Sequence, residues 1–491
     1  MGTTRSFLYM SAGVSLSKLL GVACTFLIAK FILPADFGLW TTITVVISYS
    51  TISTLGAIET LVKKYPLLVS SNQPVAASRL EQTVLFSVAL SSAFVLLSGF
   101  AIAAFAFEGP IRQVVASSSI VAATFLFSEY FYFRLSAHQR FLYVSSIESF
   151  RAVSRFAILV PLSWKFGLAG LVVGLAVNEG IVCTLAFLLN LKSGGFGPFV
   201  RPQGKALLDA IRNGLPITMV WWLLMLFNTT DRMVSMWCLG RTATGYYALG
   251  TSIASAITMI PLALGRVLYP RISEQIGKNV SPATLGLLVL KPTQILSLFL
   301  ALGIGMIVCM LPLVYLQLLP KYSPGLVSAQ ILMVACYFLS LPRNGVNYLI
   351  ATNRETELLV LLTFGILFAV LSCAVLAKTG LNIAGIALGT LAGSLLLSTM
   401  IWHRVLLSIG VSVSDQVKEL FLLYVPLLLS LVACAVSISV GSLYAESRVV
   451  STLLSEAVFV LCYFGMLSIP SPLNTWARLA LKKILGPVLP K

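Results

Sequence analysis

Three basic residues stand inside stretches that are otherwise apolar enough to cross a membrane: Lys18, Lys30 and Arg232. A charge in the hydrocarbon region is costly, so it normally faces a partner or a water-filled cavity. Lys18 lies about ten residues into its stretch, roughly 15 Å deep if the stretch is helical. We expect these cations to bind an anionic substrate. The alternatives are a structural pairing with a carboxylate and, for Lys30, extension of the side chain to the interface.

Two acidic residues share this depth, Glu179 and Asp231. Adjacent helical residues point about 100° apart, so Asp231 and Arg232 cannot pair face to face, and at least one needs another partner. Both acids are candidates for ion coupling, with an ordinary buried salt bridge as the alternative. Glu129 and Glu456 are closer to helix ends and are expected to reach lipid headgroups.

No constellation in the sequence suggests a metal, a cofactor or a catalytic group. His138 and His403 each stand alone at a helix end, where a histidine usually serves as a polar cap. The eight cysteines lie in apolar stretches without metal or redox spacing and are expected to be packing residues. The chain has no phosphate-binding loop ending in Gly-Lys-Ser/Thr, which argues against ATP hydrolysis. We therefore predict that the protein is not an enzyme.

Membrane-spanning helices must position these residues. The 491-residue chain is 58% hydrophobic and 10% charged, and a spanning helix needs about 20 mainly apolar residues. We predict an all-α polytopic protein with about fourteen such helices. A very tight turn at Trp164-Lys165-Phe166-Gly167 separates two of them, the spans 150–166 and 168–190. The predicted spans are 8–33, 39–58, 83–107, 111–133, 150–166, 168–190, 214–237, 245–268, 290–319, 325–349, 357–377, 381–402, 419–441 and 449–469.

The distribution of lysine and arginine predicts the orientation. With the N-terminus in the cytoplasm, most of the 33 basic residues fall on the inner side, as the positive-inside rule requires. Both termini are then cytoplasmic. The net charge of +17 is spread over short loops, so it favours attraction to anionic membrane lipids over nucleic acid binding. The basic residues that fall outside are Arg112, Lys165, Arg241, Lys321, Lys378 and Arg448.

Four landmarks recur in the same order at an offset of roughly 210 residues, which indicates an internal duplication. Six helices per copy would place both copies in the membrane in the same direction. We predict a six-helix lobe over 1–205, a second over 206–410, two additional spans over 411–470 and an amphipathic tail over 471–491. The paired landmarks are Gly38-Leu39-Trp40 with Gly245-Tyr246-Tyr247, Tyr65-Pro66 with Tyr269-Pro270, Ala137-His138-Gln139-Arg140 with Ala351-Thr352-Asn353-Arg354, and Gly170 and Gly174 with Gly385 and Gly389.

Several short motifs resemble the polysaccharide exporters and O-antigen flippases of the multidrug/oligosaccharidyl-lipid/polysaccharide superfamily. The motifs lie between residues 19 and 271, and the resemblance in layout covers the full length of the chain. The resemblance implies the two-lobed fold of that superfamily, extended by two helices at the C-terminal end. The matching motifs are Leu19-Leu20-Gly21, Pro34-Ala35-Asp36-Phe37-Gly38, Ala137-His138-Gln139-Arg140-Phe141, Leu215-Pro216, Asp231-Arg232, Gly245-Tyr246-Tyr247 and Tyr269-Pro270-Arg271.

The resemblance implies a flippase that moves an undecaprenyl-pyrophosphate-linked oligosaccharide across the bacterial inner membrane by alternating access, for O-antigen, capsule or exopolysaccharide synthesis. The three buried cations would then bind the diphosphate. A polysaccharide polymerase and chain-length components would be its partners, with membrane lipids around it. Sugar hydroxyls could contact Thr41, Thr44, Ser48, Thr51 and Asn228.

Two other functions remain open from the sequence. A drug or cation antiporter of the same superfamily would need a cavity dominated by carboxylates. A membrane polysaccharide polymerase or glycosyltransferase would need acidic groups on outer loops, where only Asp36, Glu108 and Glu446 are available and the loops are short.

Overall fold

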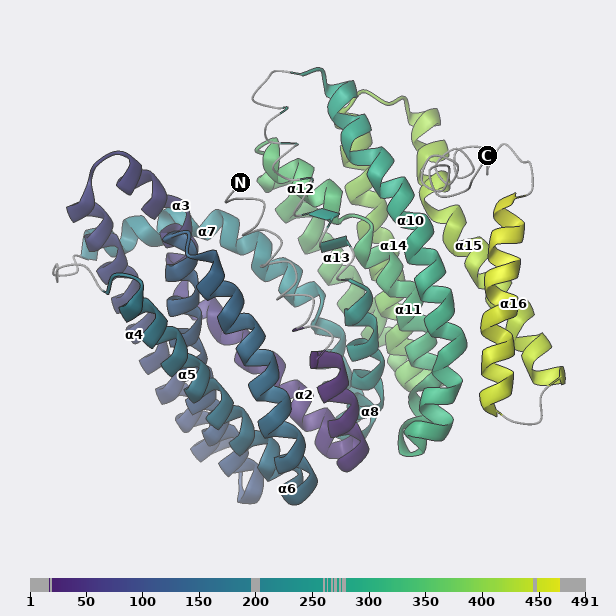
Figure 1. Cartoon of the computed structure of the whole chain (residues 1–491), viewed down its shortest axis with the longest axis horizontal. Helices are drawn as coiled ribbons and strands as arrows, with labels where there is room; N and C mark the ends of the chain where they lie inside the picture. The colour runs from purple at the N-terminus through teal and green to yellow at the C-terminus, as the bar shows by residue number, and fades with distance from the viewer. Residues whose placement is uncertain are drawn as a thin grey trace. The chain divides into compact units, whose positions relative to one another are not determined.

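The computed structural model describes residues 17, 20–195, 204–258, 280–444 and 448–468, together with 261, 262, 264, 265, 268, 272 and 275. Every element assigned within these residues is a helix (Figure 1). The predicted all-α fold class is therefore confirmed. Lys18, the Tyr269-Pro270 landmark and the predicted amphipathic tail over 471–491 lie outside the described residues.

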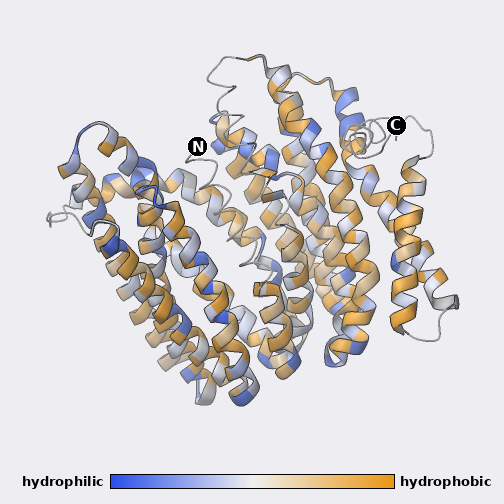
Figure 2. Ribbon diagram, in the orientation of Figure 1, coloured by the Kyte–Doolittle hydropathy of each residue, from blue (hydrophilic) through white to orange (hydrophobic). Residues whose placement is uncertain are grey.

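The helices are long and apolar enough to cross a membrane. Among the described residues, 8 helices pass this test, or up to 10 if each bent pair is one span. Two of these helices, Phe141–Lys192 and Glu355–Ser408, have 52 and 54 residues. Since about 20 residues suffice for one crossing, each of the two is long enough for two passes. Figure 2 shows the apolar bodies of the helices, with hydrophilic residues gathered mainly near their ends.

The described residues cluster into two compact units, divided between Thr229 and Thr230. In unit 1, α5 packs against both α4 and α6, and α3 packs against α4, α5 and α7. Buried Leu126, Tyr130 and Ile147 belong to the core of this bundle. The elements of unit 1 are the helix Leu20–Phe31, α2 (Pro34–Tyr49), the 3-10 helix η1 (Ser50–Thr54), α3 (Ala57–Ser70), α4 (Pro74–Ala106), α5 (Gly109–Ala137), α6 (Phe141–Lys192) and α7 (Gly204–Phe227).

In unit 2, α14 packs against α13, α11 and α8, while α15 packs against α16 and α10. Tyr247, Leu332 and Ile386 belong to a buried cluster of this unit. Its elements are α8 (Thr230–Ile257), α10 (Pro282–Leu313), the π-helical turn η2 (Val314–Leu318), the 3-10 helix η3 (Pro320–Gly325), α11 (Leu326–Ser340), α12 (Arg343–Ala351), α13 (Glu355–Leu376), the π-helical turn η4 (Ala377–Leu381), α14 (Asn382–Ser408), α15 (Val413–Tyr444) and α16 (Arg448–Ser468).

Two predicted spans differ from the structure. The span predicted over 39–58 is a bent pair, Pro34–Thr54 and Ala57–Ser70, which meet at 54°. The break lies at Leu55 and Gly56, both in the left-handed region. The span predicted over 214–237 is also interrupted, because α7 ends at Phe227 and α8 begins at Thr230. Hydropathy follows the apolar content of a window and does not respond to such a break.

Local conformations support the internal duplication. Gln139 and Asn353, the third residues of paired landmarks, are both left-handed, with φ of 58° and 56°. Gly170 and Gly385 are also alike, because a Cβ at either position would overlap the carbonyl oxygen of a residue in the preceding helical segment. Two helical segments therefore approach closely at each of these glycines. The division into six-helix lobes and two added spans stays a prediction.

Candidate functional site

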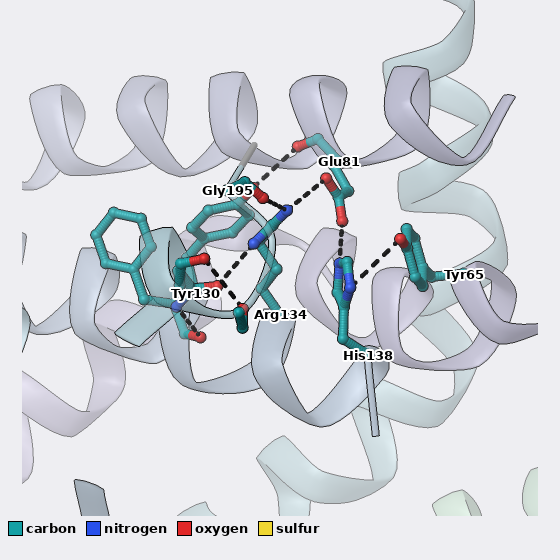
Figure 3. A network of polar contacts seen from close by, with 9 residues as sticks. Tyr65, Glu81, Tyr130, Arg134, His138 and Gly195 are labelled. Atoms are coloured by element: carbon teal, nitrogen blue, oxygen red, sulfur yellow. Dashed lines mark hydrogen bonds and ion pairs between the residues drawn. The ribbon is translucent and has the colours of Figure 1, made fainter. Parts of the chain in front are cut away.

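A buried ionic network joins three elements of unit 1 (Figure 3). Glu81 on α4 is almost fully buried, and each of its two carboxylate oxygens contacts a different side chain. Arg134 Nη2 on α5 lies 3.0 Å from Glu81 Oε2, and His138 Nε2 lies 2.5 Å from Glu81 Oε1. Tyr65 of α3 stacks on His138, with its hydroxyl 3.4 Å from Nδ1.

Arg134 extends the network to the end of α6. Its Nη1 donates to Asn190 Oδ1 and its Nη2 to the carbonyl oxygen of Gly195, both at 2.8 Å. The Arg134 side chain is 1% exposed, so its charge is compensated by these acceptors instead of by water. The network therefore ties α4, α5 and the C-terminal end of α6 together. His138 is part of it and is more than the simple polar cap that the sequence predicted.

A second polar cluster lies where α5 and the two segments of α6 meet. Arg151 Nη1 donates to Glu129 Oε1 at 3.0 Å, so the prediction that Glu129 reaches lipid headgroups is wrong. Glu148 and Glu179 also interact electrostatically with Arg151. Ser154 donates to Asn178 at 2.7 Å, which holds that amide beside Glu179. The structure thus places Glu179 among charged groups that come from three helical segments.

In unit 2, Asp231 is buried and hydrogen-bonded. Tyr247 donates its hydroxyl to Asp231 Oδ2 at 2.7 Å, and the backbone N–H of Arg232 donates to Oδ1 at 2.8 Å. Thr390 of α14 completes the chain, with its hydroxyl 3.0 Å from that of Tyr247. Because Asp231 and Arg232 are adjacent on a helix, they were expected not to pair face to face. Asp231 has a different side-chain partner, Tyr247, which lies outside its own helical turn.

The hydroxyl groups predicted to contact sugars follow one another along α2 and η1. Each donates to a carbonyl oxygen three or four residues earlier, as Thr44 does to Thr41 at 2.8 Å and Ser48 to Thr44 at 2.9 Å. Thr41 and Thr51 make the same kind of bond. A hydroxyl that donates within its helix keeps its lone pairs free for a second contact. Their role as sugar contacts stays a prediction.

The predicted cations and Asn228 occupy different environments. Lys30 is exposed near the end of the helix Leu20–Phe31, and Arg232 is half-buried beside Asp231. Asn228 is exposed at the break between α7 and α8, where its side-chain amide donates to Leu224 at 2.6 Å. Lys18 lies outside the described residues. Among the residues that are described, no group of three or more His, Cys, Asp or Glu side chains could hold a metal ion.

The two ionic networks of unit 1 could not be predicted from the sequence. Arg134 and Arg151 each stand at the end of a predicted span, among the basic residues expected on the inner side. One signal was available: Arg134 and His138 are four residues apart, and so lie on the same helix face. Their common partner Glu81 comes from another helix, and no local spacing predicts that contact.

The comparisons with known proteins agree with this architecture. A family model described as polysaccharide biosynthesis protein matches residues 3–275. The chain belongs to this family, and the resemblance that its motifs predicted is confirmed. A search of curated proteins finds no match.

Solved structures with similar folds are transporters. The lipid II flippase MurJ, in an inward closed conformation, matches with a TM-score of 0.72 at 12% identity, covering 97% of this chain and 100% of that one. An inward-facing multidrug resistance MATE family transporter of the MOP superfamily matches with a TM-score of 0.58 at 14% identity, covering 84% and 96%. The Vibrio cholerae MATE transporter VcmN in its bent form matches at 0.55 and 13%, covering 84% and 98%. The chain thus has the fold of a multi-pass membrane transporter of the flippase type.

Proposed function

We propose that this protein is a flippase for an undecaprenyl-pyrophosphate-linked oligosaccharide. It would carry this substrate from the inner to the outer leaflet of the bacterial inner membrane, for the synthesis of O-antigen, capsule or exopolysaccharide. Both termini would lie in the cytoplasm, and the chain would act as a transporter without catalysis. A polysaccharide polymerase and chain-length components would use the translocated product.

One combination of findings carries this proposal. The family match concerns polysaccharide biosynthesis, while a structural match that extends over 97% of the chain is to a lipid II flippase. For a polysaccharide biosynthesis protein with the fold of a transporter, the simplest role is to move a glycan or its precursor. A lipid-linked precursor suits the fold, because its polyprenyl tail can remain in the bilayer while the protein shields the headgroup.

The chemistry of the headgroup suggests roles for the polar residues. A diphosphate requires cations, for which Lys18, Lys30 and Arg232 are the candidates. The sugars require hydrogen-bonding groups, which the hydroxyls of α2 and η1 and the amide of Asn228 would supply. Glu179 and Asp231 are the candidates for ion coupling. An inside-negative potential also favours outward movement of an anion, by about 2.3 kcal/mol per charge per 100 mV.

A reconstitution experiment tests the proposal. Purified protein is placed in lipid vesicles with a short undecaprenyl-pyrophosphate-linked oligosaccharide that carries a fluorescent sugar. A membrane-impermeant quencher then reports how fast the inner-leaflet label becomes accessible. We expect acceleration over protein-free vesicles, and a loss of about tenfold or more in Lys18→Ala if that cation contributes at least about 1.4 kcal/mol to substrate binding.

Lys165→Ala is the matched control, because it removes a lysine from the tight turn between the two segments of α6 and should leave the rate unchanged. If the vesicles with wild-type protein flip the lipid no faster than empty vesicles, the flippase proposal fails. Proton- or sodium-driven uptake of cationic drugs would then favour an antiporter. Elongation of the glycan by the purified protein would favour a polymerase or glycosyltransferase.

A further inference from the structure

Three helices of unit 1 repeat one exposed pattern, in which a basic residue and an apolar residue lie one helical turn apart. Residues three or four apart share a helix face, so both side chains of each pair point to the same side. The apolar members are far from buried: Leu67 is 60% exposed, Val75 59% and Leu208 65%. The pairs are Lys63 with Leu67 on α3, Arg79 with Val75 on α4, and Lys205 with Leu208 on α7, where Arg212 follows one turn later.

The packing of α3 against α7 determines where these pairs lie. A Cβ at Gly214 would overlap the backbone of Gly56, and Thr60 donates its hydroxyl to the carbonyl oxygen of Ala210 at 2.6 Å. Residue numbers rise along α3 as they fall along α7, so the two helices are antiparallel and the end of α3 lies beside the start of α7. The start of α4, at Pro74, follows α3 after a short turn, and α4 packs against both helices. The three helices therefore present their pairs at a single end of unit 1.

Both α3 and the first segment of α7 are tilted relative to the helices that they adjoin. The helix over Pro34–Thr54 meets α3 at 54°, and Gly204–Pro216 meets Thr218–Phe227 at 51°. In Figure 1 the first segment of α7 runs across the direction of α4, α5 and α6. All the basic and apolar pairs lie outside the predicted spans. Tilted segments of this kind, beside spans and with basic and apolar side chains, are typical of the boundary between lipid headgroups and acyl chains.

The positive charges at this end are not neutralised by neighbouring acids. None of the four exposed basic residues forms an ion pair with any described residue, although Asp209 lies on the helix face that carries Lys205 and Arg212. Glu81 of α4 is buried and paired with Arg134. This end of unit 1 is therefore basic, and its charge is complementary to a layer of phosphate groups.

The residue types favour a lipid surface over a protein partner. Protein interfaces depend on aromatic and arginine anchors and are depleted in lysine, whereas the exposed apolar residues here are leucine and valine beside lysine or arginine. The aromatic residue of α3, Tyr65, already stacks on His138. A long basic side chain with an aliphatic neighbour suits the membrane interface, because its stem lies along acyl chains while its charge reaches a phosphate.

We propose that the second half of α3, the start of α4 and the first segment of α7 bind anionic phospholipid headgroups. The four exposed basic residues contact the phosphates, and the three exposed apolar side chains enter the boundary of the acyl chains. The net charge of the chain predicts attraction to such lipids in general, and this surface gives the attraction a defined place. It consists of other residues than the candidate substrate cations Lys18, Lys30 and Arg232. Headgroups bound there would hold α3 at its tilt, beside the Glu81 network that Tyr65 contacts.

Native mass spectrometry of the purified full-length protein tests this surface. The protein is released from micelles that contain equal amounts of phosphatidylglycerol and phosphatidylcholine, and the lipids that stay bound are counted. We expect wild type to retain phosphatidylglycerol preferentially and the combined variant at the four basic residues to lose this preference. Each single substitution should lower the retention by about fivefold, which keeps the test available if the combined variant does not fold. The four substitutions are Lys63→Gln, Arg79→Gln, Lys205→Gln and Arg212→Gln.

The matched control removes four exposed basic residues that the positive-inside rule places on the opposite side of the membrane. It has the same net charge as the combined variant and should retain phosphatidylglycerol as wild type does. Its substitutions are Arg112→Gln, Lys165→Gln, Arg241→Gln and Lys378→Gln.

Two results would overturn the proposal. Equal retention of phosphatidylglycerol by wild type and the combined variant would exclude this surface as a lipid site, and an acidic protein would remain as its partner. An equal loss in the combined variant and the control would mean that lipid binding follows the net charge of the protein and not this surface. The measurement contains no lipid-linked glycan, so its failure and a failure of the flippase proposal are distinguishable.

Discussion

Gly167 in unit 1 and Asn382 in unit 2 share nearly the same unusual backbone conformation, with φ 57° and ψ −134° at Gly167 and φ 50° and ψ −127° at Asn382. These angles are those of the first central residue of a type II′ turn, a position that strongly favours glycine. Each residue breaks a long helical stretch into two segments. The two units thus have the same backbone conformation at a helix break, with glycine in one unit and asparagine in the other.

This conformation predicts opposite effects for substitutions at the two breaks. Gly167→Ala should destabilise the protein by about 1–3 kcal/mol, the cost of a non-glycine residue in a sparsely populated region. Asn382→Gly should be neutral or raise stability by up to about 1 kcal/mol. Thermal unfolding of purified protein in detergent, followed by intrinsic fluorescence, measures both changes.

Gly180→Ala is the control for this pair. A Cβ at Gly180 or at Gly167 would meet nothing within 4 Å, so only the backbone conformation distinguishes the two sites. Because Gly180 is in a regular helical segment, alanine there should stabilise by about 0.5–1 kcal/mol. If both alanine variants shifted the unfolding temperature in the same direction, backbone strain would not explain the break.

The contact between α3 and α7 gives a second prediction. A Cβ at Gly214 would overlap the carbonyl oxygen of Gly56, which stands at the bend before α3. Because the obstacle is backbone, Gly214→Ala should force the helices apart and destabilise by several kcal/mol, on the order of an overpacked core. Gly204→Ala, on the same helix with nothing within 4 Å, should be tolerated. Expression yield and a monodisperse profile in size-exclusion chromatography report the difference.

The Glu81 network predicts that the stability of the protein depends strongly on the charge of Glu81. Glu81→Gln removes the charge that compensates Arg134, a side chain that is 1% exposed, and should cost about 3–5 kcal/mol of stability. Glu357 offers a matched control, because it pairs with Arg354 at 2.9 Å and Arg404 at 2.8 Å while 31% exposed. Glu357→Gln should cost less than about 1 kcal/mol. Equal unfolding temperatures for the two variants would contradict the argument.

A fourth prediction concerns the hydrogen bonds of Asp231. Tyr247→Phe removes the hydroxyl that donates to the carboxylate at 2.7 Å, and should destabilise by about 1.5–3 kcal/mol because the acceptor is charged and buried. In Asp231→Asn the partner is neutral, so the same tyrosine substitution should cost less. The double-mutant cycle, measured by thermal unfolding, gives the coupling between the two residues; additive effects would mean that no such bond exists.

Much of the fold could be predicted because membrane crossing depends on composition. Any apolar stretch of about 20 residues becomes a spanning helix in lipid, and the tight turn at Trp164-Lys165-Phe166-Gly167 was visible as polar and glycine residues between two such stretches. The bend at Leu55 and Gly56 was not, because both residues are compatible with a helix in an apolar window. There the chain bends where α3 packs against α7.

The sequence by itself determined that this chain is built of many helices apolar enough to cross a membrane and that it resembles the polysaccharide exporters, and it predicted a duplicated plan. These properties depend on hydropathy, charge distribution and short motifs, which are local. Only the tertiary structure decided which charges meet. Glu81 reaches Arg134, and Glu129 reaches Arg151, from helices that pack side by side, and a partner on another helix leaves no trace in the spacing of residues along the chain.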